Sequence, residues 1–349
     1  MLTGLVLGVL GVSPFVLVYA LFIRWVDRFE PEPTWLLLAS FAYGAAFATL
    51  GGGVSSRVVQ NAAAAFLGVS SSSHGMEAMA STVLAPLFEE SFKGFGLCAI
   101  ALASAAGLHE LDGPLDGVIY GGIIGLGFTL TEDILYVATT YAERGFGAFA
   151  GLLFVRTVLL GLSHCTFTAM TGLGFGLAAV VTKPGLKVAF PILGYGAAVG
   201  LHALHNGLPT FFGSGGAVVM ILFTWATVLC FFALVAALVA RDRALVVQEL
   251  SGELGELLHV RELERVATYV GLAVENLEVL FAQGWGPFRL RRAKQLALVE
   301  LAFVKHRRRR GQSDRFLDER EATLRARILD ANRQGVWLGS SGRGTKSPS

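Results

Sequence analysis

The chain has 349 residues, of which 54% are hydrophobic and only 15% are charged, and its formal net charge is +2. Its mean hydropathy is +0.60. This composition excludes a disordered chain and a disulfide-rich secreted domain, and it favours an integral membrane protein. The three cysteines (Cys98, Cys165 and Cys230) lie in apolar stretches, so we expect neither a disulfide framework nor a cysteine metal site.

Seven stretches are long and apolar enough to cross the roughly 30 Å hydrocarbon core of a bilayer. The first resembles a signal peptide in position, but it lacks a basic start and its apolar run is too long, so we expect an uncleaved span. The sequence therefore predicts an all-α polytopic protein with about seven transmembrane helices. In chain order the stretches are 3–24, 34–56, 78–106, 116–140, 147–182, 188–212 and 216–240.

The charge of the chain changes sign near residue 240. Residues 1–240 hold eight Lys and Arg against twelve Asp and Glu, whereas the remainder holds twenty against fourteen. We therefore predict a transmembrane domain over 1–240, a region of amphipathic helices over 241–334, and a disordered Gly/Ser-rich tail over 335–349.

Basic residues in the short loops predict the orientation of the chain, because Lys and Arg favour the cytoplasmic side. Three pairs fall on one side of a seven-span topology: Arg24 with Arg28, Lys183 with Lys187, and Arg241 with Arg243. This pattern predicts an N-terminus outside and a helical cytoplasmic C-terminal region. A bacterial inner membrane is the expected location.

Ionisable and polar residues interrupt four successive apolar stretches at similar depths. A charged side chain at the bilayer centre costs at least about 2.5–3.5 kcal/mol, so such residues are expected to face the bundle interior, to pair, or to do chemistry. They are Glu89, Glu90 and Lys93; Glu132 and Asp133; Arg156 and His164; and His202, His205 and Asn206.

These residue types at one depth are consistent with a hydrolytic site. Glu89 and Glu90 both reach Lys93 along a helix, so one carboxylate can be held ionised while the other serves as general base for water. Two histidines with a carboxylate form a known catalytic zinc set, here His164, His202 and Glu132. A metal-free site, in which a glutamate and His164 activate water, is equally compatible with the sequence.

The last polar pair supplies the oxyanion chemistry of such a site. His202 and Asn206 are four residues apart and share a helix face, so the Asn206 amide can donate to a developing oxyanion. Arg156 is expected to neutralise a buried acid. His205 is expected to be structural.

Four ordered sequence blocks resemble the PrsW-type intramembrane proteases, which are related to the CAAX prenyl endopeptidases and bacteriocin-processing membrane proteases. The resemblance covers roughly residues 15–240. Asp133 and His205 depart from the family pattern, which has Asn and more often an aromatic residue there. The blocks are Glu89-Glu90-x-x-Lys93, the segment 113–121 continuing to Phe128-x-x-x-Glu132, Arg156 with His164 and Thr171-Gly172, and His202-x-x-x-Asn206.

The resemblance implies an intramembrane metalloprotease-like peptidase that cleaves another membrane protein near or within its spanning segment. An anti-sigma factor or a similar single-span regulator is the implied substrate. The alternative from the residues alone is a proton or cation transporter or channel, since such pathways also use midplane acids and histidines. A third hypothesis is a scaffold or sensor that works through the C-terminal region.

Two basic groups, 289–294 and 305–310, mark the C-terminal region. We expect them to form a solvated cytoplasmic face, with contact to anionic lipids as the alternative. No helix-turn-helix or zinc-finger pattern is present in the sequence, so no nucleic-acid partner is expected.

Overall fold

The computed structural model describes residues 1–27, 31–310 and 315–339. In these ranges the chain is helical and forms no β-strand. It divides into two compact units. The first comprises Met1–Asp27 and Pro31–Ala236, and the second contains the described residues from Ala237 onward.

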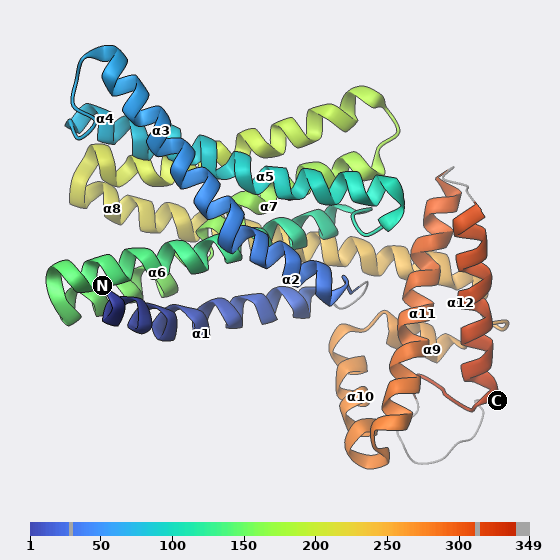
Figure 1. Cartoon of the computed structure of the whole chain (residues 1–349). Coiled ribbons are helices and arrows are strands. Elements are labelled where there is room, and N and C mark those ends of the chain that lie inside the picture. Colours follow the sequence, from blue (N-terminus) through green and yellow to red (C-terminus); the bar gives the residue numbers. More distant parts are fainter. Residues whose placement is uncertain (28–30, 311–314, 340–349) are drawn as a thin grey trace. The chain divides into compact units, whose positions relative to one another are not determined.

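The helices of the first unit carry the apolar stretches, and four of them continue into short π-helical turns (Figure 1). Such turns often accompany functional sites. In chain order they are α1 (Leu2–Val26), α2 (Thr34–Tyr43), η1 (Gly44–Ala48), α3 (Thr49–Leu67), α4 (His74–Met79), η2 (Ala80–Leu84), α5 (Ala85–Ala103), η3 (Ser104–Leu108), α6 (Pro114–Phe154), η4 (Val155–Leu159), α7 (Ser163–Val180) and α8 (Pro184–Leu250).

Within the described residues, five continuous helical stretches are long and apolar enough to cross a membrane. A helical membrane protein is therefore confirmed. Each of the two longest stretches contains a turn where glycine adopts a positive φ that other residues rarely accept: Gly145 (φ 78°) in α6 and Gly213 (φ 56°) in α8. The stretches are Leu2–Val26, Thr34–Leu67, His74–Leu108, Pro114–Val180 and Pro184–Glu253.

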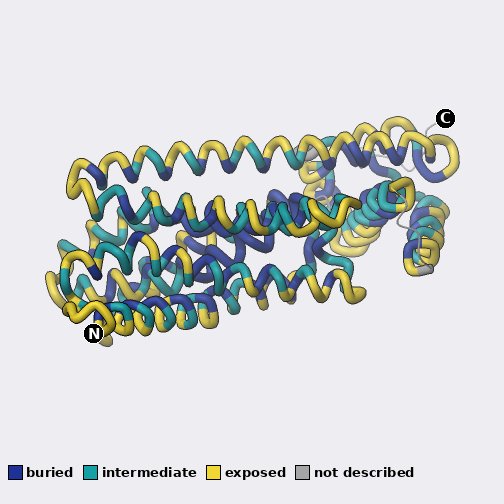
Figure 2. Tube along the Cα trace, turned by 90° about the horizontal axis from the view of Figure 1, so that it is seen from above, coloured by how far each residue is buried: buried dark blue, intermediate teal, exposed yellow. Residues whose placement is uncertain are grey.

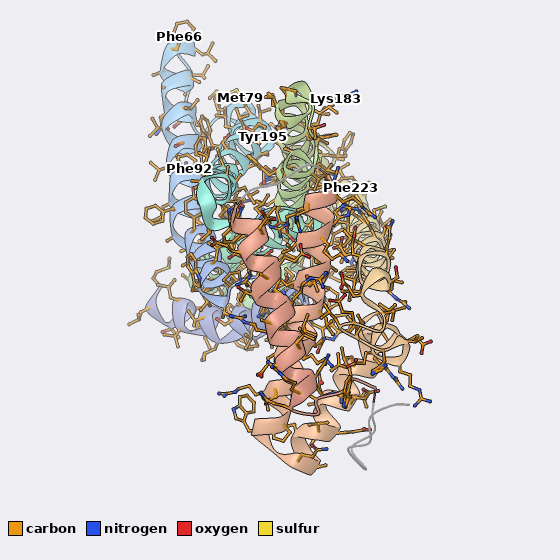
Figure 3. The ribbon with its side chains drawn as sticks, turned by 90° about the vertical axis from the view of Figure 1, so that its right-hand side faces the viewer. Phe66, Met79, Phe92, Lys183, Tyr195 and Phe223 are labelled. Atoms are coloured by element: carbon orange, nitrogen blue, oxygen red, sulfur yellow. The ribbon has the colours of Figure 1, made fainter. Side chains whose placement is uncertain are left out.

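The outer faces of these helices are apolar, as a lipid environment requires. Phe66, near the end of α3, is 90% exposed, and Leu2 is 76% exposed (Figure 3). Buried residues gather where the helices meet (Figure 2). Lipid gives no hydrophobic driving force between helices, so close packing of small residues must supply the association.

Helices α6 and α7 pack through glycines at four-residue spacing. A Cβ added at Gly117 would lie 2.0 Å from the Gly172 carbonyl oxygen, and one at Gly121 would lie 2.6 Å from that of Thr168. One at Gly125 would lie 2.4 Å from the carbonyl oxygen of His164. The α6–α7 contact therefore fixes the position of His164 relative to α6.

The helices of the second unit pack around a core of aliphatic side chains that includes Leu250, Leu257, Leu298, Leu324 and Ile328. Besides the end of α8 it contains η5 (Ser251–Glu253), α9 (Val260–Val266), α10 (Tyr269–Gln283), α11 (Trp285–Arg309) and α12 (Arg315–Arg333).

One expectation for this region is corrected. The basic group 289–294 is not a uniformly solvated face, because Arg291 (4% exposed) and Lys294 (2%) are buried. Lys294 Nζ lies 2.5 Å from Glu262, and Arg291 pairs with Glu275. These ion pairs compensate the buried charges.

Residues 335–339, the start of the region predicted as a tail, make contacts within the second unit. The backbone N–H of Leu338 donates to Glu262 at 3.0 Å, and its side chain is buried. The Trp337 carbonyl accepts a hydrogen bond from Arg291 at 2.9 Å. Residues 340–349 lie outside the described part of the chain.

Candidate active site

The other contacts of the site are arranged around a buried ion pair on α5. Lys93 Nζ donates to Glu90 Oε1 at 2.7 Å, and both side chains are fully buried. The ammonium also lies 3.7 Å from the centre of the Phe128 ring on α6. Because the two residues are three apart on one helix, the pairing follows directly from the sequence spacing.

Glu90 makes further hydrogen bonds to two other helices. Its Oε2 accepts from the Thr168 hydroxyl of α7 at 3.0 Å, and its Oε1 lies 3.1 Å from His202 Nδ1 of α8. An ionised carboxylate can only accept, so His202 Nδ1 carries the proton and its Nε2 keeps a lone pair. Glu90 therefore orients His202.

His164, near the start of α7, lies between a cation and a carboxylate. Its Nδ1 is 3.0 Å from Lys93 Nζ, and its Nε2 is 2.9 Å from Glu132 Oε2. An ammonium has no acceptor, so Nδ1 accepts from Lys93 while Nε2 donates to Glu132. The imidazole rings of His164 and His202 are 4.9 Å apart, centre to centre.

Arg156, in the π-helical turn η4, binds the two consecutive acids of α6. Its guanidinium donates to Glu132 and to Asp133, and it also lies 4.1 Å from the ring centre of Tyr136. The second carboxylate oxygen of Asp133 is buried without a hydrogen-bond partner in the described structure. The expected role of Arg156 as a neutralising partner matches this geometry.

Glu89 differs from Glu90, Glu132 and Asp133, because neither of its oxygens accepts a hydrogen bond from a described residue. Its Oε2 is buried, makes no hydrogen bond to any described residue, and lies 3.8 Å from His202 Nε2. Ligand atoms of Glu89, His164 and His202 all lie within 4.8 Å of one another. An unpartnered carboxylate oxygen therefore faces the imidazole nitrogen that keeps a lone pair.

This donor set fits a divalent metal. Two imidazoles and one carboxylate match a known catalytic zinc ligand set. With all carboxylates ionised, the three buried acids Glu89, Glu90 and Asp133 and the partly buried Glu132 outnumber the cations Lys93 and Arg156 by two charges. A divalent cation would balance that difference, and on His164 Nε2 it would replace the proton shared with Glu132.

Seven of the residues predicted from the sequence form one connected network. They are Glu89, Glu90, Lys93, Glu132, Arg156, His164 and His202. The predicted metal set contained Glu132, whereas the clustered donors contain Glu89 in its place.

Asn206 and His205 make separate contacts on α8. The Asn206 amide donates to the Ser81 carbonyl of η2 at 2.9 Å. His205 Nδ1 lies 3.0 Å from the Thr224 hydroxyl. A further hydrogen bond of 2.7 Å joins the hydroxyls of Ser91 and Tyr195, and so links α5 to α8.

The sequence analysis missed two residues of the site. Thr168 donates to Glu90, and Phe167 stacks on His202 with the ring centres 5.4 Å apart. Thr168 lies four residues after His164 and so shares its helix face, which is the signal that would have identified it. Phe167 has no comparable signal in the sequence.

Comparison with known proteins identifies the family. The family model described as PrsW family intramembrane metalloprotease matches residues 32–240, which carry every residue of the network. The chain belongs to the PrsW family. The resemblance seen in the four sequence blocks is therefore confirmed.

Relatives that share the PrsW name align over part of their length. Protease PrsW of Oceanobacillus iheyensis is 31% identical over 125 residues, covering 34% of this chain and 49% of that protein. Protease PrsW of Geobacillus kaustophilus is 32% identical over 74 residues, covering 21% and 29%. The chain thus spans about half or less of these relatives. No solved structure matches it.

Proposed function

We propose that the chain is an intramembrane endopeptidase whose active site is centred on Glu89, His164 and His202. The observation that carries the proposal is the buried Glu89 oxygen, which has no partner among the described residues and faces His202 Nε2. An uncompensated carboxylate is costly in an apolar bundle. A role in binding water, substrate or metal explains why it is there.

The two adjacent glutamates have different roles in this proposal. Both Glu90 oxygens are occupied, by Lys93 and His202 on one and by Thr168 on the other. Glu90 therefore positions His202. Glu89 is the general base that takes a proton from the attacking water.

A divalent metal, Zn²⁺ by its ligand chemistry, would be held by His164, His202 and Glu89. When bound, it would act as a Lewis acid on the scissile carbonyl. A carboxylate has two oxygens, so Glu89 can contribute one to the donor set and accept a proton at the other. Glu132 was predicted from the sequence as the carboxylate ligand of the metal. It would instead orient His164 through their hydrogen bond, while Arg156 holds Glu132 in position.

Asn206 remains the predicted oxyanion donor. Its amide nitrogen carries two N–H groups, and one of them is used by the Ser81 carbonyl. The second is available to a substrate oxygen. The Ser81 contact fixes the amide in one orientation, which lowers the entropic cost of that interaction.

The substrate in this proposal is another membrane protein, cut in or beside its spanning segment. A single-span regulator such as an anti-sigma factor is the preferred class. We further infer seven spans, because turns at Gly145 and Gly213 divide the two longest helical stretches. The predicted cytoplasmic C-terminus follows from that count and the loop charges.

The proposal is tested by mapping new protein N-termini in bacterial membranes that contain the wild type or Glu89→Gln. Cleavage within or next to spanning segments should appear only with the wild type. Glu77→Gln, at an exposed glutamate of α4, is the matched control and should cleave normally. Identical N-termini with the wild type and Glu89→Gln, at equal amounts of folded protein, would overturn the proposal.

A transport function is the weaker candidate. Its support is the set of buried ionisable residues, which the protease proposal also uses, and the family is one of proteases. Ion flux in proteoliposomes that depends on Glu89, together with no proteolysis in the same preparation, would favour it.

A further inference from the structure

A turn joins α10 to α11 in the second unit (Figure 1). All residues from 281 to 287 are exposed, and none of them carries a charge. Phe281 is 84% exposed and Trp285 is 64% exposed. We call residues 281–287 the α10–α11 tip.

The apolar character of the tip extends along one face of α10. Val274 (47% exposed) and Leu277 (50% exposed) lie seven and four residues before Phe281, so all three share a face. On the other side, the Trp285 ring lies 5.3 Å from that of Phe288, centre to centre. A contiguous, exposed apolar and aromatic patch of this kind marks an interaction surface.

Basic residues follow the tip directly. Arg289 is exposed and Arg292 is partly exposed, whereas Arg291 between them is buried against Glu275. Cations near a helix N-terminus oppose the helix dipole, and the first turn of α11 contains no acid to offset them. Arg289 therefore does not stabilise α11 through the helix dipole, and an external anionic partner would explain its position there.

The tip is also tethered to the bilayer by the chain itself. Helix α8 (Pro184–Leu250) contains apolar membrane-length sequence and continues into the second unit, which begins at Ala237. The second unit is thus covalently joined through α8 to apolar sequence of membrane-spanning length. Such tethering raises the effective concentration of the lipid surface.

We propose that the α10–α11 tip is a membrane-docking surface that inserts Phe281 and Trp285 into the interfacial region of an anionic bilayer. Exposed Trp and Phe beside Arg are the side chains that anchor protein segments at this depth. A symmetric contact with a second copy is disfavoured, because it would bring the exposed Arg289 side chains of both copies together.

The test uses the full chain in nanodiscs of phosphatidylcholine with phosphatidylglycerol. An NBD fluorophore is attached at Trp285→Cys or, as a matched control, at Ala322→Cys on α12. Ala322 is exposed and adjoins Glu321, which binds Arg308 at the opposite end of α11. Labelled wild type gives the background from the three native cysteines. Nitroxide lipids and aqueous cobalt then quench the probe from the bilayer and from water.

Docking predicts that the probe at 285 is quenched by nitroxide lipids and shielded from cobalt, whereas the probe at 322 shows the reverse. The Arg289→Gln variant should lower the ratio of docked to undocked tip about fivefold on anionic bilayers. It should have little effect on pure phosphatidylcholine. Phe281→Glu should abolish lipid quenching at 285.

Two results would overturn the proposal. Cobalt quenching at 285 equal to that at 322 would show that the tip stays in water. Shielding from cobalt without lipid quenching would show that a protein surface covers it. Neither readout depends on proteolysis, so the protease proposal stands or fails separately.

Discussion

Replacement of Lys93 by methionine tests the buried network most directly. Met keeps an unbranched side chain but removes the charge, so Glu90 loses its 2.7 Å partner and His164 Nδ1 loses its donor. Glu90 is fully buried, and removal of one partner of such a pair costs about 3–5 kcal/mol in unfolding free energy. Neutralising both partners is often close to neutral, so Glu90→Gln, Lys93→Met should recover most of the loss.

The unfolding free energy is measured on the purified full chain by titration of mixed micelles with SDS, with helicity followed by circular dichroism. Lys187→Met makes the same substitution at an exposed lysine of the first unit and should change the free energy by less than about 0.5 kcal/mol. The reasoning is refuted if Lys93→Met is as stable as this control. It is also refuted if the double variant is as unstable as Lys93→Met.

Three further predictions concern the metal, the acid pair and the helix packing. The His164→Ala, His202→Ala double variant should lose tightly bound divalent metal in elemental analysis, and full retention would exclude both histidines as ligands. Asp133→Asn should change the unfolding free energy by less than about 1 kcal/mol, since an amide can replace the carboxylate whose second oxygen is unpartnered. Gly117→Val should destabilise the chain by about 3 kcal/mol or more, because its Cβ would lie 2.0 Å from the Gly172 carbonyl oxygen.

A matched glycine provides the control for the packing variant. Gly53 on α3 has open space where a Cβ would be added, so Gly53→Val should be tolerated to within about 1 kcal/mol. Equal destabilisation by both substitutions would mean that the close α6–α7 contact is not the cause of the lost unfolding free energy. The same SDS titration measures both.

Much of the fold follows from composition and spacing. Long apolar runs can satisfy their backbone groups in lipid only as helices, so the helical membrane class is determined by the sequence. The sequence also marked the turns inside the two longest helical stretches. The predicted breaks at 141–146 and 213–215 contain Gly145 and Gly213, which have positive φ in the structure.

The ion pairs of the C-terminal region could not be predicted from the sequence. Arg291 and Lys294 look like members of one basic surface group in the sequence, yet each is buried beside an acid from another helix. Their partners, Glu275 and Glu262, are 16 and 32 residues away along the chain. Helical spacing predicts contacts over three or four residues and says nothing about these.

The sequence by itself determined the family, the helices that carry the ionisable residues, and the Glu90–Lys93 pair, because a helix fixes neighbours three and four residues apart. Only the tertiary structure decided how the acids differ. Glu90 forms hydrogen bonds with side chains of α7 and α8, and Glu132 accepts one from Arg156. Glu89 keeps an unpartnered oxygen beside His202. These differences depend on the rotation and separation of packed helices. Close contacts between helices, such as that of Gly125 with His164, set this rotation and separation. Residue spacing within one helix does not predict them.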